Sequence, residues 1–346
     1  MALLVRMISE ETYRIHRTII YCIVLFFEIF GLFGNLNLVV LTIRKKSLRT
    51  KYGYILATLA FVHTLCLLYE LIDMGFSVAA SVYFYEIRRR ACFLVLFPYV
   101  FLNSIQTGTM WILALDLLVT IIFPLKCRNF NIPIYFGCLF FLPVVYGAAA
   151  VIFGFIFLDD EPIPMCNPPS ALHPFVKAHW YYFMMVFTIL TVVFYVIALA
   201  LIYYKAHRNY ADIRYIERKA LKTLKFLIFL FVMFRFITIS VASALMAIGV
   251  DNEIVELVQN YNIIAGIMAY SQNAYVCYFR SAEYRKLLSE QISKIHPKLG
   301  AMLPKLSGES SAGGQHWHIS GASIIQTKPL KSKKNNNKKW SNSRKI

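Results

Sequence analysis

Seven apolar segments occupy most of this chain, and their length constrains the fold more than any other feature. They cover residues 18–43, 52–78, 92–123, 132–158, 178–204, 221–249 and 254–279. A helix needs about 20 apolar residues to cross a bilayer core, and each segment exceeds that length. Backbone polar groups in lipid must hydrogen bond within their own segment, which favours helices. We therefore predict an all-α membrane protein, built as a seven-transmembrane helix bundle.

The composition agrees with this class and argues against a nucleic-acid partner. The sequence is 58% hydrophobic and only 16% charged, which is typical of membrane proteins. Its net charge of +18 is concentrated in short connections and in residues 280–346. An anionic lipid surface accounts for basic residues at these places better than phosphate recognition does.

The distribution of lysine and arginine predicts the orientation of the chain. Most of the 36 basic residues lie on one side of the bundle, in residues 44–51, 126–128, 205–225 and 280–346. Acidic residues mark the opposite side, in residues 159–161 and 251–256. Because cytoplasmic connections are enriched in basic residues, we expect an extracellular N-terminus and a cytoplasmic C-terminus in the plasma membrane. The three arginines at 88–90 argue against this orientation, but the total outweighs them.

Four regions are expected along the chain. Residues 1–17 form an extracellular tail that is charged and lacks a signal-peptide core, so the first span serves as the insertion signal. Residues 18–279 form the helical membrane domain. Residues 280–296 are amphipathic and basic, which predicts a short helix on the cytoplasmic leaflet. Residues 297–346 are predicted to be a disordered basic tail that binds anionic lipid.

The seven cysteines show no metal-ligand spacing, so neither a metal nor another cofactor is expected. Cys92 and Cys166 differ from most of the others because they lie at the outer edges of the predicted spans. Disulfides persist on that side, which predicts a Cys92–Cys166 bond, although sequence alone does not establish its geometry. The bond would hold a proline-rich loop over the mouth of the bundle.

The first two spans carry polar residues that are costly in lipid. Glu28 and Asn35 are seven residues apart and share a helical face, and the nearby Gly31 and Gly34 would let a neighbouring helix approach closely.

In the second span His63 and Glu70 share a face, and Asp73 lies one turn beyond Glu70. They suit a proton relay, a metal site or simple pairing with polar groups on other spans, and the lone histidine favours pairing. Arg235 in the sixth span also needs a carboxylate partner, for which Glu28, Glu70 and Asp73 all remain open.

The third span contains Tyr99, Asn103, Gln106 and Asp116. Intramembrane polar groups of this kind usually face the interior of a bundle and mark function. The alternative for Asp116 is a helix-end acid that only reaches the lipid headgroups. At the outer end of the fifth span, residues 180–182 (Trp-Tyr-Tyr) favour an aromatic interface belt over pocket lining.

Several short motifs together resemble the rhodopsin-like G-protein-coupled receptors. Gly34–Asn35 is similar to the Gly-Asn pair of span one, and residues 59–63 (LAFVH) are similar to Leu-Ala-x-x-Asp in span two. Asp116–Leu117 occupies the position of Asp-Arg-Tyr, and residues 273–285 (NAYVCYFRSAEYR) look like the Asn-Pro-x-x-Tyr box with its following helix.

A narrower resemblance is to the SX class of nematode serpentine chemoreceptors, over residues 18–295. It is carried by CNPPSA at 166–171, YSQNAYV at 270–276, Glu70–Leu71 and RSAEYRK at 280–286. The resemblance implies a chemosensory receptor, not an enzyme, with a heterotrimeric G protein and a small-molecule or peptide ligand as partners.

The resemblance also implies a set of switch and coupling residues: Asn35, His63, Asp116, Leu117, Asn273, Tyr278 and Arg280. Leu117 stands where the family has its arginine, and His63 replaces the family's aspartate. Ala274 replaces the proline of span seven, and span six has no proline, so the usual kink sites are missing. These departures imply a modified switching route or weak signalling.

The ligand is expected among the outer halves of the spans, near Asp73, Asn103, Gln106, Trp180, Arg235, Asn262 and Tyr270. One rival is a ligand-gated channel or transporter that uses His63, Glu70, Asp73 and Arg235, but no repeated half-structure supports it. A second rival is an intramembrane hydrolase that uses Asp116. Hydrolysis by two carboxylates needs both groups close together, whereas Asp73 and Asp116 are expected near opposite faces of the membrane.

Overall fold

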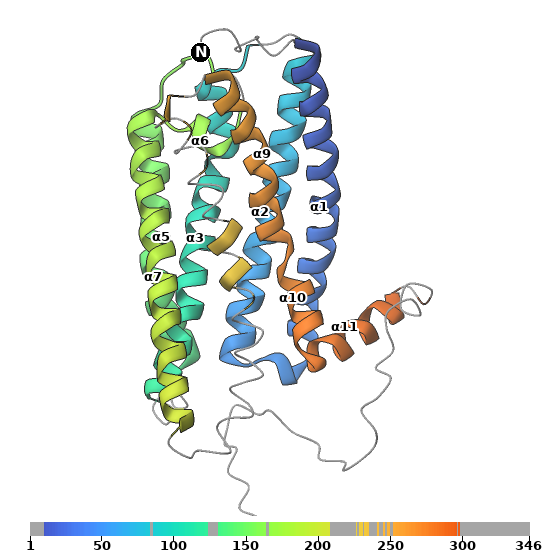
Figure 1. Cartoon of the computed structure of the whole chain (residues 1–346), viewed down its shortest axis with the longest axis vertical. Helices are drawn as coiled ribbons and strands as arrows, with labels where there is room; N and C mark the ends of the chain where they lie inside the picture. The colour runs from blue at the N-terminus through green and yellow to red at the C-terminus, as the bar shows by residue number, and fades with distance from the viewer. Residues whose placement is uncertain are drawn as a thin grey trace, which may run out of the picture.

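The computed structural model describes residues 10–83, 86–123, 131–163, 166–207 and 252–295, together with residue 297 and scattered residues between 226 and 249 (Figure 1). Most of the predicted sixth span, including Arg235, lies outside the described residues. Residues 1–9 of the predicted N-terminal tail and nearly all of the predicted C-terminal tail do so as well.

Five described helices are long and apolar enough to cross a membrane. They lie within α1 (Glu10–Arg44), α2 (Lys51–Val82), α3 (Arg89–Ile122), α5 (Ile132–Ile156) and α7 (Pro174–His207). The predicted seventh span corresponds to α9 (Asn252–Ser271) followed by α10 (Asn273–Arg280). Two short elements, η1 (Lys46–Leu48) and α6 (Pro168–Ala171), lie in connections. Every named element of the described chain is helical, which confirms the predicted all-α membrane class.

Two helix boundaries differ from those expected. α1 begins at Glu10, within the segment predicted as an N-terminal tail. α2 extends outward to Val82, four residues beyond the predicted apolar segment. Both extensions lie beyond the apolar segments, where helix ends are no longer constrained by the thickness of the bilayer core.

α3 is the central helix of the bundle, and it contacts α2, α5, α6 and α7 (Figure 1). About 61% of its most apolar window is buried, against 22% for the corresponding windows of α5 and α7. A helix with neighbours on most sides can carry polar groups that lipid would exclude. The polar residues of the third span therefore face protein.

The surface of the bundle is apolar and part of its interior is polar. Large side chains such as Phe26, Phe141 and Val196 are more than half exposed, whereas Asn35 and His63 are fully buried. A soluble protein rarely exposes so much continuous apolar surface, but lipid tails solvate it well. The distribution supports the membrane-spanning assignment independently of helix length.

The predicted close approach at the glycines of α1 is confirmed. A Cβ atom on Gly31 would overlap Ser271 Oγ of α9, and one on Gly34 would lie 2.9 Å from the Tyr275 ring of α10. Small residues at these positions bring the helices into contact, as is common in membrane bundles. The last span is therefore packed directly on the first.

The last span is interrupted although it lacks the proline of the family motif. α9 ends at Ser271 and α10 begins at Asn273, with Gln272 between them (Figure 1). The Ser271 hydroxyl is within hydrogen-bond distance of Ile267 O in its own helix and of Phe27 O in α1. A hydroxyl that bonds back to the preceding turn bends helices. The interruption at Gln272 therefore occurs without a proline, at a residue whose backbone keeps helical angles (φ −74°, ψ −26°).

The predicted cytoplasmic helix is present as α11 (Ala282–Ile295), which leaves the bundle at a steep angle (Figure 1). Its apolar side is buried, including Leu288 and Ile292. Gln291 Nε2 donates to Asn37 Oδ1 at 2.8 Å, which fastens the helix to α1. We call this end of the bundle the α11 end, and the opposite end, where Cys92 and Cys166 lie, the disulfide end.

Candidate functional site

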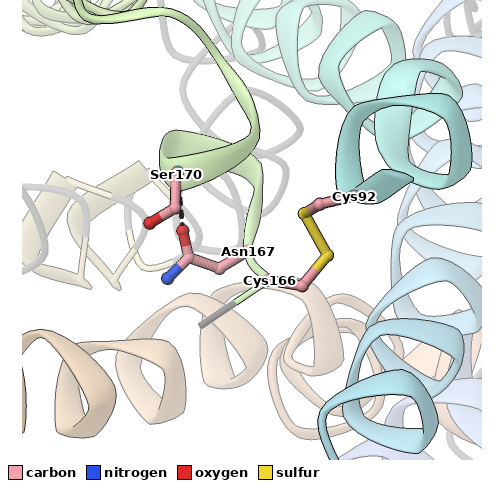
Figure 2. The surroundings of a disulfide bond; sticks show 4 residues. All are labelled: Cys92, Cys166, Asn167 and Ser170. Atoms are coloured by element: carbon pink, nitrogen blue, oxygen red, sulfur yellow. Dashed lines mark hydrogen bonds between the residues drawn. A yellow bond between two sulfur atoms is a disulfide. The ribbon is translucent and has the colours of Figure 1, made fainter. Parts of the chain in front are cut away.

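The disulfide end is closed by the predicted Cys92–Cys166 bond (Figure 2). It joins the first turn of α3 to the loop before α6, and both cysteines are fully buried. Next to it, Asn167 caps α6 because its Oδ1 accepts a hydrogen bond from the Ser170 N–H at 2.8 Å (Figure 2). The loop is thereby fixed at two successive residues.

Ion pairs reinforce the same end and account for two of the three unexpected arginines, Arg88 and Arg89. The Arg89 guanidinium contacts the carboxylates of Asp159 and Glu161, and its side chain is only 10% exposed. Arg88 pairs with Asp160 at 3.3 Å and forms a backbone bridge with Pro162. These basic residues are neutralised by the acidic loop, so they do not contribute a free positive charge to this side.

Trp180 lies inside the bundle, and the belt interpretation is wrong for it. Only 3% of the residue is exposed, and it packs in the apolar cluster that contains Cys92. Its Nε1 donates to Ser104 Oγ of α3 at 3.3 Å. Tyr182, two residues later, is 69% exposed and faces outward as an interface residue would.

A hydrogen-bonded cluster joins α2, α3 and α9 within the bundle. The Tyr99 hydroxyl donates to Glu70 Oε1 at 2.5 Å and lies 3.0 Å from the Tyr270 hydroxyl. Asn103 Nδ2 donates to the same Tyr270 hydroxyl at 3.2 Å. We call Glu70, Tyr99, Asn103 and Tyr270 the tyrosine cluster. Each of these hydrogen bonds joins two different helices, so a shift of one helix changes the cluster.

A second group lies deeper and is connected to the first through Tyr270. Asn273 Nδ2 lies 2.6 Å from His63 Nδ1 and 3.4 Å from Asn35 Oδ1. Asn35 Nδ2 donates to the Tyr270 carbonyl at 2.8 Å, and the Tyr270 ring lies 5.2 Å from the His63 ring. Asn35, His63 and Asn273 thus bring polar side chains of α1, α2 and α10 together inside the bundle.

The predicted ligand residues are only partly brought together. Asn103 and Tyr270 are in contact, and Gln106 accepts a hydrogen bond from Thr107 in the same turn of α3. Asp73 and Asn262 are buried, on α2 and α9 respectively. Arg235 lies outside the described residues, so its carboxylate partner stays open.

Glu70 and Tyr99 are the members of the tyrosine cluster that the set of predicted ligand residues omitted. A signal was available, because Tyr99 is four residues before Asn103 and therefore on the same face of α3. Glu70 bonded to Tyr99, and His63 bonded to Asn273, agree with simple pairing of the polar groups of the second span. Within the described chain, no group of three His, Cys, Asp or Glu side chains could hold a metal ion.

At the α11 end, Asp116 is held inside the bundle rather than at the lipid headgroups. Its Oδ1 accepts a 2.7 Å hydrogen bond from the Tyr135 hydroxyl of α5 and lies 3.4 Å from Lys51 Nζ of α2. The Lys51 ammonium also lies 4.4 Å from the centre of the Tyr135 ring. The interior interpretation of Asp116 is therefore the better one.

The other predicted coupling residues lie around this end. Leu117 is half-buried and packs with Phe194 of α7 in apolar surroundings. Tyr278 is buried in the core cluster, and the exposed Arg280 lies with its guanidinium 4.7 Å from the Phe226 ring. No positive charge stands at position 117 to pair with the adjacent Asp116.

Comparison with known proteins agrees with a seven-transmembrane membrane class. The family model of the serpentine type seven-transmembrane GPCR chemoreceptors of the Srsx class matches residues 28–292. This range spans all the helices from within α1 to within α11. No curated protein matches the chain. Since the match covers most of the sequence, the chain belongs to the Srsx family of serpentine seven-transmembrane GPCR chemoreceptors.

Proposed function

We propose that this chemoreceptor binds a small molecule or peptide among the disulfide-end halves of its helices and activates a cytoplasmic heterotrimeric G protein. The observation that carries the proposal is the hydrogen-bonded connection from Glu70 through Tyr99 and Tyr270 to Asn35 and Asn273. It joins several helices across the interior of the bundle. Contacts of this kind have discrete arrangements, which is what a switch between two states requires.

The proposal orients the disulfide end toward the outside of the plasma membrane and the α11 end toward the cytoplasm. The charge distribution supports this orientation, because Arg88 and Arg89 of the disulfide end are paired with acids. Lys45 and Lys51 at the α11 end belong to the basic connection after α1. A cytoplasmic α11 would place its exposed Lys294 near anionic lipid of the inner leaflet.

The ligand would act by favouring one arrangement of the tyrosine cluster over the other. A ligand that bound both states equally would shift nothing, so it must gain or lose contacts when the helices move. Tyr270 is suited to this role because its hydroxyl belongs to the tyrosine cluster and its carbonyl bonds to Asn35. Asp73, Gln106, Trp180, Asn262 and Arg235 remain proposed contributors to the ligand site.

The test is guanine-nucleotide exchange on a panel of heterotrimeric G proteins, with purified receptor in lipid vesicles and a library of odorants and peptides. We expect the wild type to respond to at least one compound and Tyr270→Phe to respond at least tenfold less. Tyr182→Phe is the matched control, because it removes the same hydroxyl from an exposed ring of α7. Equal responses of the two variants would contradict a role for the tyrosine cluster.

Leu117→Arg is the second arm of this experiment. A response of the wild type shows that coupling proceeds without an arginine at position 117. A response of Leu117→Arg alone shows a receptor whose native coupling is weak. If neither responds and a compound evokes an ion current in the same vesicles, the channel or transporter that uses His63, Glu70, Asp73 and Arg235 replaces the receptor proposal.

A further inference from the structure

Three acidic side chains of α1 and α2 lie near one another inside the bundle, and the tyrosine cluster uses only Glu70 among them. Glu28 of α1 is fully buried and Asp73 of α2 is 5% exposed. Electrostatic repulsion acts between Glu28 and Glu70, and between Asp73 and each of these two acids. We call Glu28, Glu70 and Asp73 the acid cluster.

The packing of α1 turns Glu28 toward the neighbouring helices. Gly31 is three residues after Glu28 and therefore lies on the same side of α1. A Cβ atom on Gly31 would overlap Ser271 of α9 and would lie 2.8 Å from Leu67 Cδ1 of α2. Glu28 thus belongs to the face of α1 that packs against α2 and α9, not to the face that meets lipid.

Two members of the acid cluster carry oxygens that the described chain leaves without a donor. Both carboxylate oxygens of Glu28 and Oδ1 of Asp73 are buried and have no hydrogen-bond partner among the described residues. No ion pair of the described residues includes a member of the acid cluster. Buried carboxylates are costly unless they are paired, so these oxygens are suited to a cation that binds there.

An apolar cavity lies about one helical turn from Asp73, toward the disulfide end. Its volume is about 340 Å³, and it is lined by Phe76, Ala79, Ala80 and Tyr83 of α2. Phe76 and Ala80 follow Asp73 by three and seven residues and therefore share its side of the helix. Cavities of this size and character accept the apolar part of a small molecule.

We infer that the acid cluster binds the ammonium group of an organic amine whose apolar part occupies this cavity. An ammonium group has three donors and no acceptor, which complements the open oxygens of Glu28 and Asp73. The same charge attracts Glu70, which accepts the hydrogen bond of Tyr99, so binding reaches the tyrosine cluster. The inference names the ligand class of the proposed function and rests on that function for its effect on signalling, whereas the binding itself does not.

The first readout is thermal unfolding of the purified receptor in detergent with two matched sets of small compounds. One set is phenethylamine, phenethyl alcohol and phenylacetic acid, and the other is hexylamine, hexanol and hexanoic acid. We expect the amines to raise the unfolding midpoint by about 3 °C, because a ligand that binds only the folded state stabilises it. Amines that raise the midpoint no more than the matching alcohols would overturn the inference.

Substitutions that remove one charge locate the effect. Glu28→Gln and Asp73→Asn should each weaken amine binding about tenfold, because each removes a buried partner of the ammonium group. Glu86→Gln is the matched control, since Glu86 is an exposed acid that pairs with Arg88. Without amine, Glu28→Gln should be at least as stable as the wild type, because it removes a buried carboxylate that has no partner. Equal amine affinities in Glu28→Gln and Glu86→Gln would overturn the inference.

Two other cations are rivals of the amine. Arg235 lies outside the described residues. If Arg235 pairs with Glu28, Arg235→Gln and Glu28→Gln each lower the unfolding midpoint and the double variant is no less stable than either, which would overturn the inference. We expect instead that Arg235→Gln keeps the shift caused by the amines. Sodium chloride that raises the midpoint as much as the amines do, with the same loss in Glu28→Gln, would assign the acid cluster to an inorganic cation and overturn the organic one.

Nucleotide exchange separates this inference from the proposed function. Amines that stabilise the receptor through Glu28 but cause no exchange on any G protein would keep the amine site and reject the proposed function. A receptor that responds to neutral compounds, and that amines do not stabilise, would keep the proposed function and reject the amine site.

Discussion

The two ends of the bundle are held together by different kinds of bond. At the disulfide end, Cys92–Cys166, the Arg89 ion pairs and the Arg88–Pro162 bridge fasten the loop before α6 to α3. At the α11 end, Lys51 of α2 and Tyr135 of α5 both contact the Asp116 carboxylate of α3. The first set includes a covalent bond, whereas the second can break and re-form. Under the proposed function the α11 end faces the cytoplasm and opens, which this asymmetry would permit.

The difference in strength can be put in rough numbers. A disulfide that closes a loop of 74 residues stabilises a fold by about 4 kcal/mol in the chain-entropy account. A partly exposed ion pair contributes about 1 kcal/mol or less. The α11 end is therefore the end that a proposed ligand could open with a modest preference for one state, because no covalent bond joins its three side chains.

The largest effect is expected from Cys92→Ser combined with Cys166→Ser. Loss of the bond should reduce stability by about 2 to 5 kcal/mol, because the loop is no longer constrained in the unfolded chain. Thermal unfolding in detergent and the yield of monodisperse receptor measure this. Cys22→Ser with Cys138→Ser is the control, since both cysteines are free and exposed. Equal losses of stability in the two double variants would show that the disulfide does not stabilise the receptor.

The next effect concerns the region between the two ends, where α1 packs on the last span. Gly31→Ala should cost about 1 to 3 kcal/mol, because its Cβ would overlap Ser271 Oγ. Gly75→Ala is the control, since nothing lies within 4 Å of that position. Both are read by thermal unfolding. A Gly31→Ala variant as stable as Gly75→Ala would show that the helices are not in close contact.

A smaller effect is expected for the ion pairs of the disulfide end. Arg89→Ala leaves Asp159 without its buried partner and should cost about 2 kcal/mol, less than a fully buried pair because both acids keep contact with solvent. Arg88→Ala should cost less than about 0.5 kcal/mol, because half of that side chain is exposed. Unfolding midpoints of the two variants give the comparison. A larger loss of stability for Arg88→Ala than for Arg89→Ala would mean that burial does not determine the strength of these ion pairs.

The smallest effect tests which cation pairs with Asp116 at the α11 end. In a Leu117→Arg receptor, the new guanidinium stands beside Asp116 and can replace the Lys51 ammonium as its partner. Lys51→Gln should then lower the stability less than it does in the wild type, with a coupling of about 0.5 to 1 kcal/mol measured by thermal unfolding. Additive effects of the two changes would indicate that the introduced guanidinium and Lys51 serve separate contacts.

Much of the fold could be predicted from the sequence because lipid imposes strong constraints. Length and apolarity located the described spans, and the side of the membrane selected Cys92 and Cys166 as partners. Gly31 and Gly34 indicated the close helix contact in a similar way, since only small residues allow it. These features depend on one residue type at one position.

The polar contacts were harder to predict because they depend on pairs of distant residues. Asp116 is expected to mark function, but its partners belong to other helices: Lys51 ends the basic connection after the first span, and Tyr135 lies inside the fourth apolar segment. Trp180 was assigned to the interface belt, although its ring points inward to Ser104. The break at Gln272 was missed because a serine hydroxyl, not a proline, accompanies it.

The most direct test of the asymmetry is a pair of distances measured in one receptor. Spin labels at Tyr54→Cys and Ile134→Cys report the distance between α2 and α5 at the α11 end, and labels at Val82→Cys and Ile156→Cys report it at the disulfide end. Both distances are measured in the receptor alone and in its complex with the G protein that responds in the exchange panel. The account predicts a longer distance at the α11 end and an unchanged distance at the disulfide end in the complex. A distance at the α11 end that stays constant, or one at the disulfide end that changes as much, would contradict it.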